Sequence, residues 1–201
     1  MSNLKENYHH GDLRDSLINA TLELIRVNGP EKFSMADACK EAGVSKAAPY
    51  RHFSNREALL EAVIEHGFDQ MTIAMQRASK DLTPGSNERI IALGLTYVNF
   101  AIAEPELFRL MFGEKLKPLN ECNEPMGRGT FQLLLDEIIV RTRLSEIDKL
   151  MEVAFPLWTL VHGAATLTID NSYEMIYPGS DTEAMIISTT ETLLSVYPCH
   201  C

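Results

Sequence analysis

One segment near the N-terminus, FSMADACKEAGVSKAAPYRHF, limits most strongly how this chain can fold. Ser34 stands where a serine can cap a helix, and Asp37 follows three residues later, at the position of the acidic partner in a capping box. Gly43 can turn the chain because glycine accepts positive φ without a steric penalty. Ser45 can then cap a second helix over 46–53. The segment therefore predicts two short helices joined by a tight turn.

Two short helices at this spacing predict a helix-turn-helix, which places its second helix in the DNA major groove. Pro49 falls at the end of the first turn of that second helix. A proline costs least there, because the early backbone N–H groups of a helix have few or no intrahelical partners. The run Ser54-Asn55-Arg56-Glu57 has the pattern of a capping box and starts a long helix, which we expect over about 55–80.

The remaining sequence predicts helices and no strands. Apolar residues recur every three or four positions over 12–28 and again along the long helix. Further helical segments are expected over 87–103, 105–112, 125–143, 145–171 and 181–197, with a close contact at Gly163. We therefore expect an all-α chain with a three-helix helix-turn-helix DNA-binding domain over 1–57, a second helical domain over 58–201, and the helix at about 55–80 linking the two.

Bulk properties narrow the class of protein. Of the 201 residues 45% are apolar, which is enough for a sizeable core. We find no run of about 18 apolar residues and no apolar stretch near the polar N-terminus, so neither a membrane span nor a secretory signal is expected. The four cysteines are too few and too scattered for a disulfide scaffold, which favours a reducing, cytoplasmic setting.

The net charge of −10 is distributed unevenly. Residues 1–60 hold eight basic and eight acidic side chains, so the whole excess of negative charge lies in 61–201. The acidic part would repel phosphate and leave only one end of the molecule to meet DNA. Because the N-terminal part is neutral rather than basic, we expect modest non-specific affinity for DNA.

Three runs in the N-terminal third resemble the TetR family of transcriptional regulators. They are Gly43-Val44-Ser45, Tyr50-Arg51-His52-Phe53 and Arg56-Glu57-Ala58-Leu59-Leu60. Tyr8-His9-His10-Gly11-Asp12-Leu13-Arg14 is also similar to the entry to the first helix in part of that family. Tyr, His and Phe at this spacing behind a Gly-Val-Ser turn are specific in combination, although each piece alone would be weak. The resemblance covers roughly the first third of the chain strongly and the remainder loosely.

Two C-terminal runs resemble the regulatory domain of one TetR subgroup. Leu157-Trp158-Thr159-Leu160-Val161-His162-Gly163 is similar to a Trp…His-Gly signature of that subgroup, and Glu104-Pro105-Glu106-Leu107-Phe108-Arg109-Leu110-Met111-Phe112 is similar to another of its segments. The resemblance implies that the domain over 58–201 binds an effector and dimerises through its last two helices.

Candidate DNA contacts gather on the second helix of the motif and its caps. Lys46 stands at the end that meets base edges in this motif, and a lysine can donate to guanine O6 and N7. Ala47 and Ala48 are small enough to let the helix approach closely, and their methyl groups can touch thymine methyls. Ser34 and Ser45 can add hydroxyl or helix N-terminal contacts to phosphate. A solvated lysine is the alternative for Lys46.

The family resemblance adds three further DNA contacts. It implies that Tyr50 and His52 contact phosphates and that Arg56 reaches the DNA backbone from the start of the long helix. Packing against the first helix is the alternative role for Tyr50. The complete set of candidates is Ser34, Ser45, Lys46, Ala47, Ala48, Tyr50, His52 and Arg56.

Aromatic and methionine side chains in the second domain are candidates for a ligand cavity. Trp158 and His162 are four residues apart and share one helix face, and each needs a polar partner when buried. That partner can be a ligand or a backbone carbonyl, and side chains at helical spacing also form ordinary core. The candidates are Phe100, Phe108, Met111, Phe112, Phe131, Trp158 and His162.

These patterns favour a ligand-responsive DNA-binding regulator, most often a repressor in this family, that binds a palindrome as a homodimer and is released by a small molecule. The alternatives are a small all-α enzyme and a protein-binding helical module. We find no GxSxG, HExxH, Walker or GxGxxG motif, and we predict no catalytic residue and no cofactor. The Cys199-His200-Cys201 tail lacks a second ligand pair, so no metal site is predicted.

Overall fold

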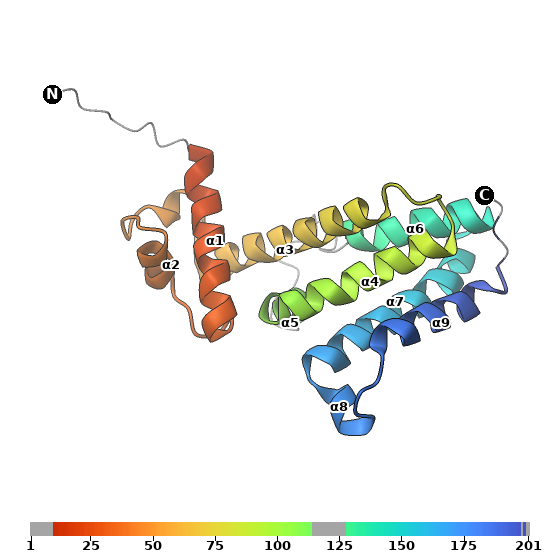
Figure 1. Cartoon of the computed structure of the whole chain (residues 1–201). Coiled ribbons are helices and arrows are strands. Elements are labelled where there is room, and N and C mark those ends of the chain that lie inside the picture. The colour runs from red at the N-terminus through yellow and green to blue at the C-terminus, as the bar shows by residue number, and fades with distance from the viewer. Residues whose placement is uncertain (1–9, 114–127, 198, 200–201) are drawn as a thin grey trace.

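The computed structural model describes residues 10–113 and 128–197 together with Cys199. No strand occurs among these residues, and the predicted all-α class is confirmed. Figure 1 shows α1 and α2 at one end of the molecule and a helical bundle at the other, with α3 running between them. The elements are α1 (His10–Asn28), α2 (Met35–Glu41), the 3₁₀ turn η1 (Pro49–Arg51), α3 (Arg56–Ser79), α4 (Asn87–Ala103), α5 (Pro105–Phe112), α6 (Arg128–Thr142), α7 (Ile147–Ile169), α8 (Ser172–Ile176) and α9 (Thr182–Leu194).

The N-terminal domain consists of α1, α2, η1 and the first turns of α3 around an apolar core. Leu17 and Ile25 of α1 and Leu59 of α3 are completely buried there. Phe33 and Phe53 complete this core from the connections that flank α2 and η1, with 4% and 3% of their surfaces exposed. Each connection is thus fixed to the core by one phenylalanine.

Serine and asparagine caps set where two of these helices begin. The Ser34 hydroxyl accepts from the Asp37 backbone N–H at 3.2 Å, and the Asp37 carboxylate accepts from the Ser34 N–H at 3.0 Å, which confirms the predicted capping box. The capping box expected at Ser54 is wrong, because Asn55 is the cap of α3. Its extended backbone places Oδ1 2.8 Å from the Ala58 N–H.

The C-terminal bundle is arranged around α4. Helices α3, α7 and α9 pack along α4, and α6 packs against both α3 and α7. Leu93, Tyr97 and Ala101 of α4 are buried in the middle of this arrangement. Helix α5 packs against α1, α3 and α4. It therefore connects the bundle with the N-terminal domain.

A buried arginine fastens the end of the bundle that is farthest from the N-terminal domain. Arg141 of α6 is 5% exposed and donates to the backbone carbonyls of Tyr197 at 2.7 Å, Gly85 at 3.0 Å and Leu194 at 3.3 Å. Glu137, one turn earlier, accepts from the Gly85 N–H at 2.7 Å and pairs with an arginine of α4 at 2.7 Å. The α3–α4 loop and the end of α9 are thereby tied to α6.

Among the described residues, α7 is the one unbroken helix whose length and apolar composition would allow it to cross a membrane. A core helix meets the same criteria, and α7 packs against α4, α6 and α9. Its outer surface includes Phe155, 52% exposed, and Gly163. No described residue lies within 4 Å of the position that a Cβ of Gly163 would take, so the close contact expected there is not made within the described part of the chain.

Candidate DNA-binding surface and ligand cavity

The segment after the turn does not form the α-helix expected over 46–53. Only Pro49–Arg51 is helical, as the 3₁₀ turn η1, and the three residues before it form a tight turn. Pro49 explains the difference, since its nitrogen has no hydrogen to donate to the Ser45 carbonyl. That carbonyl instead accepts from the Ala48 N–H at 3.0 Å. The recognition segment is therefore a compact pair of turns closed by a proline.

This recognition segment presents most of its candidate DNA contacts to solvent. Ser45, Lys46 and Ala47 are exposed, and Ala48 is half-buried. Tyr50 is 62% exposed, which disfavours the alternative that it only packs against α1. These side chains point outward from a turn whose proline is buried. They can therefore contact DNA without a rearrangement of the core.

Ser34 is exposed but already engaged. Its hydroxyl donates to Asp37 Oδ2 at 2.6 Å while accepting from the Asp37 N–H, and the bond from this hydroxyl lowers the pKa of the Asp37 carboxyl. The carboxylate is thus held in its charged form beside the hydroxyl, where it repels a phosphate. The geometry favours Ser34 as a helix cap over Ser34 as a phosphate contact.

Two of the contacts implied by the resemblance are turned toward the protein. Arg56 donates from Nε to the Phe33 carbonyl at 3.2 Å and from a terminal nitrogen to the Pro30 carbonyl, and its guanidinium lies 4.6 Å from the Phe33 ring centre. His52 Nε2 is buried and has no hydrogen-bond partner among the described residues. Arg56 therefore fixes the entry to α2, and His52 cannot offer Nε2 to a phosphate without moving.

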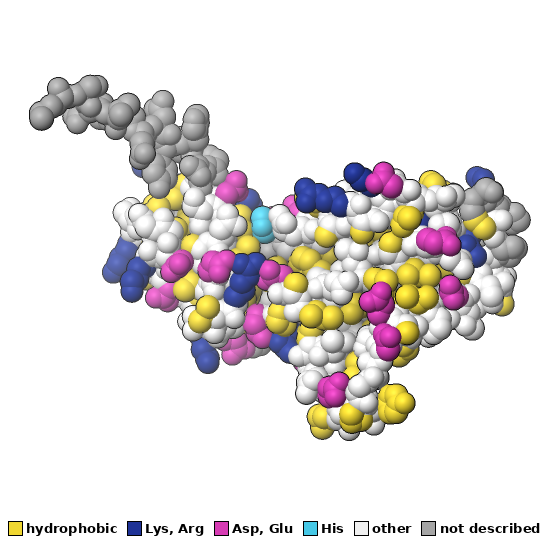
Figure 2. All heavy atoms as spheres, in the orientation of Figure 1, with side chains coloured by type: hydrophobic (Ala, Val, Ile, Leu, Met, Phe, Trp, Pro, Cys, Tyr) yellow, Lys and Arg dark blue, Asp and Glu magenta, His cyan; other side chains and the backbone are white. Residues whose placement is uncertain are grey.

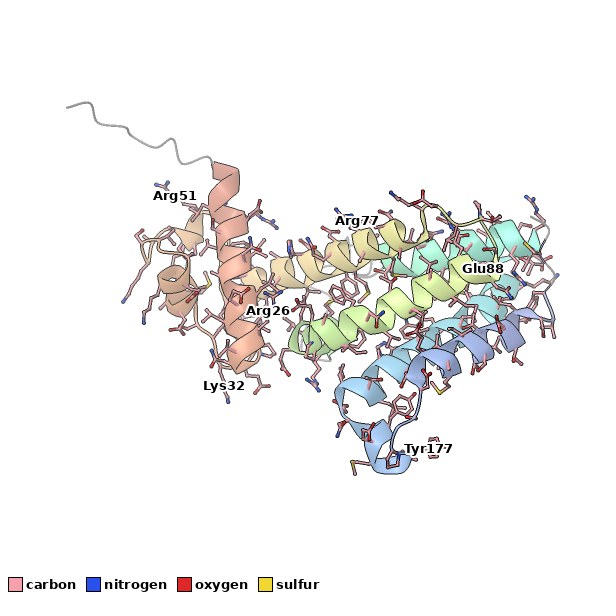
Figure 3. All side chains as sticks on the ribbon, in the orientation of Figure 1. Arg26, Lys32, Arg51, Arg77, Glu88 and Tyr177 are labelled. Atoms are coloured by element: carbon pink, nitrogen blue, oxygen red, sulfur yellow. The ribbon has the colours of Figure 1, made fainter. Side chains whose placement is uncertain are left out.

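Basic side chains stand at the outer edge of the N-terminal domain, away from the bundle (Figure 2). Lys32, Lys40, Lys46 and Arg51 are all exposed. Figure 3 shows Lys32 and Arg51 at opposite ends of this domain. Arg51 was not among the predicted DNA contacts, because a lone arginine on a short helix is usually a surface residue. Its place on η1 makes it a further candidate for a phosphate contact.

A cavity of about 540 Å³ lies in the bundle between α3, α4, α6, α7 and α9, with the end of α5 at its wall. Three of the candidate ligand residues line it, namely Phe112, Phe131 and Trp158. Other lining residues were missed, among them Tyr97, Thr130 and Thr190. These come from three different helices, and their spacing in the sequence gives no sign that they meet.

Four other candidates do not line the cavity. Phe108 is 2% exposed and lies between Tyr97 and Phe112, with ring centres 5.6 and 4.8 Å away. Met111 fills the space that a side chain at position 67 would need, and Phe100 packs against the core. Both therefore contribute to packing rather than to the cavity wall.

His162, the fourth, lies behind the wall. Its ring stacks on Trp158, with 4.9 Å between ring centres and 19° between planes, and its Nδ1 lies 2.8 Å from the Tyr97 hydroxyl. Burial lowers the pKa of His162 and raises that of Tyr97 well above its ordinary range. Both groups are therefore neutral near pH 7, and the Tyr97 O–H can donate to Nδ1.

The two cavity threonines differ in their hydrogen bonding. Thr72 donates its one hydroxyl proton to the Phe68 carbonyl at 2.8 Å, so Thr130, 3.1 Å from the Thr72 oxygen, is the donor of that second bond. Thr190 is 3% exposed, and no hydrogen bond joins its hydroxyl to any described residue. Because Thr190 lines the cavity and its hydroxyl has no such bond, Thr190 is a place where a bound molecule could form a hydrogen bond.

Sequence profiles of two families match most of the chain. The profile of the bacterial regulatory proteins, tetR family, matches residues 17–63, and that of the tetracyclin repressor-like C-terminal domain matches residues 90–193. The chain belongs to the TetR family. The subgroup with the Trp…His-Gly signature is not distinguished by these matches and stays a prediction.

Three known proteins are similar to this chain in structure or in sequence. A protein of unknown function from Rhodococcus sp. RHA1 is 28% identical, with a TM-score of 0.78 over 96% of this chain and 100% of that one. A TetR variant from Acinetobacter baumannii AYE in complex with minocycline is 16% identical, with a TM-score of 0.63 over 95% and 97% of the two chains, and shows the fold alone. Nucleoid occlusion factor SlmA of Aliivibrio fischeri is 32% identical over 109 residues, and this chain spans about half of its length, 55%.

Proposed function

We propose that this TetR-family chain is a ligand-responsive, sequence-specific DNA-binding regulator, a repressor that a small molecule releases from its operator. The observation that carries the proposal is the course of α3. Its first turns belong to the core of the N-terminal domain through Leu59, and farther along it Phe68 and Met75 line the cavity. A rearrangement of the cavity can therefore be transmitted to the recognition segment through one continuous helix.

A second connection runs through α5. Arg26, near the end of α1, donates to both carboxylate oxygens of Glu104 at the start of α5, from Nε at 2.8 Å and from a terminal nitrogen. Figure 3 shows Arg26 on the side of α1 that faces the bundle. Phe112, at the other end of α5, lines the cavity. A ligand that displaces Phe112 would thus move the element to which α1 is attached.

Such a response requires that the ligand bind the released conformation more tightly than the DNA-bound one. The minocycline in the A. baumannii neighbour supports the idea that a bundle of this fold can hold a small molecule. A DNA-binding role also supports the cytoplasmic setting that the cysteine content favours.

We infer that the active form is a homodimer built on the outer faces of α7 and α9. On α7 this face carries the exposed Leu167, with Gly163 one turn before it leaving room for another helix. On α9 it carries small side chains such as Ala184 and Ser188, both exposed. A second copy of the face would bury this apolar surface, and a two-fold dimer would place two recognition segments on a palindrome.

The first test is selection of bound sequences from a random duplex library at near-physiological salt. We expect an enriched inverted repeat. Lys46→Ala should lose about 1–3 kcal/mol of binding free energy and relax the preference at one base pair, whereas Tyr50→Ala should weaken all sites alike. Lys80→Ala, an exposed lysine at the far end of α3, is the control. No enrichment by folded protein, or parental binding by both variants, would contradict the proposal.

The two alternatives have separate readouts. A small all-α enzyme would turn over the molecule that it binds, which mass analysis of the recovered ligand would reveal. A protein-binding helical module would show no saturable binding to one duplex sequence. If no operator is enriched and one of these two results is found instead, the corresponding alternative would replace the regulator assignment.

A further inference from the structure

The described residues that line the cavity carry no charge. The lining includes no Asp, Glu, Lys, Arg or His among them, and most of it is aromatic, aliphatic or methionine side chain. Its polar atoms belong to neutral groups: the Tyr97 and threonine hydroxyls and the Trp158 indole. An ionised ligand group placed here would lose its hydration and find no opposite charge, which costs several kcal/mol.

Tyr97 in the cavity wall and His162, which contacts it, do not supply a charge either. Burial keeps His162 neutral by lowering its pKa, and it keeps the Tyr97 phenol protonated by raising its pKa. Nδ1 of His162 already faces the Tyr97 hydroxyl at 2.8 Å. The pair therefore presents a dipole to the cavity and not an ion.

Two groups in the wall are available to orient a ligand. Thr190 lines the cavity and its hydroxyl forms no hydrogen bond with any described residue, and Thr130, which donates to Thr72, keeps its lone pairs as acceptors. The rings of Phe131 and Trp158 are arranged edge to face, and their centres lie 6.4 Å apart. Aromatic walls of this kind favour flat apolar molecules.

We propose that the effector of this protein is an uncharged, largely aromatic molecule that forms a hydrogen bond with Thr190, and that the cavity discriminates against anions. The inference rests on the proposed function only in treating the ligand as a regulator of DNA binding. The preference of the cavity for uncharged molecules can be measured without DNA. The volume of about 540 Å³ lies within the range of small-molecule sites.

A matched pair of probes tests the charge preference. N-phenylnaphthylamine is neutral, and anilinonaphthalene sulfonate adds an anionic group to the same aromatic frame. Trp158 is the single tryptophan of the chain and lines the cavity, so quenching of its emission reports binding there. We expect the neutral probe to bind about tenfold more tightly or better. Equal or tighter binding of the sulfonate, or no quenching by either probe, would overturn the proposal.

A charge placed in the wall should reverse this preference. Met151 lines the cavity and is half-buried, and lysine has a side chain of similar length that can extend toward solvent. We expect Met151→Lys to shift the ratio of the two affinities about tenfold toward the sulfonate, while Met151→Leu leaves it unchanged. An unchanged ratio in folded Met151→Lys would show that the wall does not set the preference. If that variant fails to fold, the parental ratio alone decides.

The Thr190 contact has its own control on the same helix. Thr190→Val keeps the shape of the side chain and removes the hydroxyl, and Thr189→Val does the same at a neighbouring position that does not line the cavity. The amine of N-phenylnaphthylamine can donate to Thr190, so we expect Thr190→Val to weaken binding about threefold to tenfold. Equal binding by the two variants would remove Thr190 from the proposal.

DNA binding, measured in the same samples by anisotropy of a selected duplex, separates the two proposals. Specific DNA binding without preference for the neutral probe would refute the inference and leave the regulator standing. Preference for the neutral probe by a protein that enriches no duplex would support the cavity chemistry and refute the regulator.

Discussion

Helix α3 passes through two regions of one buried core, and only the second of them borders a cavity. In the N-terminal domain its residues Leu59 and Val63 are completely buried in a filled core. In the bundle, Phe68 and Met75 of the same helix line a cavity of about 540 Å³. Close-packed interiors transmit displacement, whereas a cavity lets its lining rearrange. The comparison suggests that a ligand-driven change starts in the bundle and that the DNA-binding domain follows as a rigid body.

The largest expected effect lies at the end of the bundle that Arg141 ties together. Arg141→Met should lower the free energy of unfolding by about 3 kcal/mol, because the carbonyls of Gly85, Leu194 and Tyr197 would all lose a buried donor. Urea unfolding followed by circular dichroism measures this. Arg77→Met, at an exposed position of α3, should change stability by less than about 0.5 kcal/mol. Equal effects of the two variants would mean that this end is not fastened by Arg141.

Substitution of Arg56 tests whether its hydrogen bonds to the segment before α2 stabilise the N-terminal domain. Arg56→Met should cost about 2 kcal/mol of stability, because the Pro30 and Phe33 carbonyls lose their charged donor. DNA affinity should fall in parallel, as the entry to α2 loosens. The control is Arg51→Met, which we expect to weaken DNA binding without a loss of stability. If Arg56→Met kept its stability and lost only DNA affinity, the contact implied by the resemblance would be the better explanation.

His162 makes the stability of the bundle depend on pH. Since burial lowers the pKa of His162, the unfolded state binds its proton at a higher pH than the folded state. Stability is therefore full above the ordinary histidine range and falls as the pH drops through about 6.5. We expect His162→Asn to reduce the loss of stability between about pH 7 and 5. Denaturant titrations at the two pH values would show this, and parallel losses in parent and variant would contradict it.

The smallest stability effect is expected where the two regions meet. Arg26 and Glu104 are partly exposed, so a double-mutant cycle with alanine should give a coupling of about 0.5 kcal/mol. The same variants should still bind DNA. Their DNA affinity should change less when a ligand is added, because a displacement of α5 would no longer move α1. The looser pair Arg14–Glu65, 3.9 Å apart, provides the control. An undiminished ligand response in Arg26→Ala would show that α3 alone transmits the signal.

The sequence was sufficient for most of the long helices, but not for the segment over 46–53, for α8, or for the contacts that side chains make between helices. Periodicity and caps predicted the course of the chain, and Ser34 with Asp37 forms the expected capping box. Pro49 was judged tolerable in a helix, but the loss of one donor was enough to convert the expected α-helix into turns. The division of the chain at 57 and 58 stays a prediction.

The cavity shows why site residues were harder to predict. Phe112, Phe131 and Trp158 were named because large aromatic side chains stand out in a sequence. Thr130 and Thr190 lie 60 positions apart and resemble any helical threonine until α6 and α9 are placed around the same space. Phe108 and Met111 have the same composition signal as the wall residues, and only their burial against α3 and α4 separates them.

The proline-closed recognition segment also affects how such a protein can evolve. Lys46 and Ala47 belong to no regular helix, and their exposed side chains add little to the core. Substitutions at such positions usually change stability by less than about 0.5 kcal/mol. Pro49 beneath them is buried and holds the turn in place. Operator preference can therefore diverge between duplicated copies of the gene while the fold and the cavity stay the same.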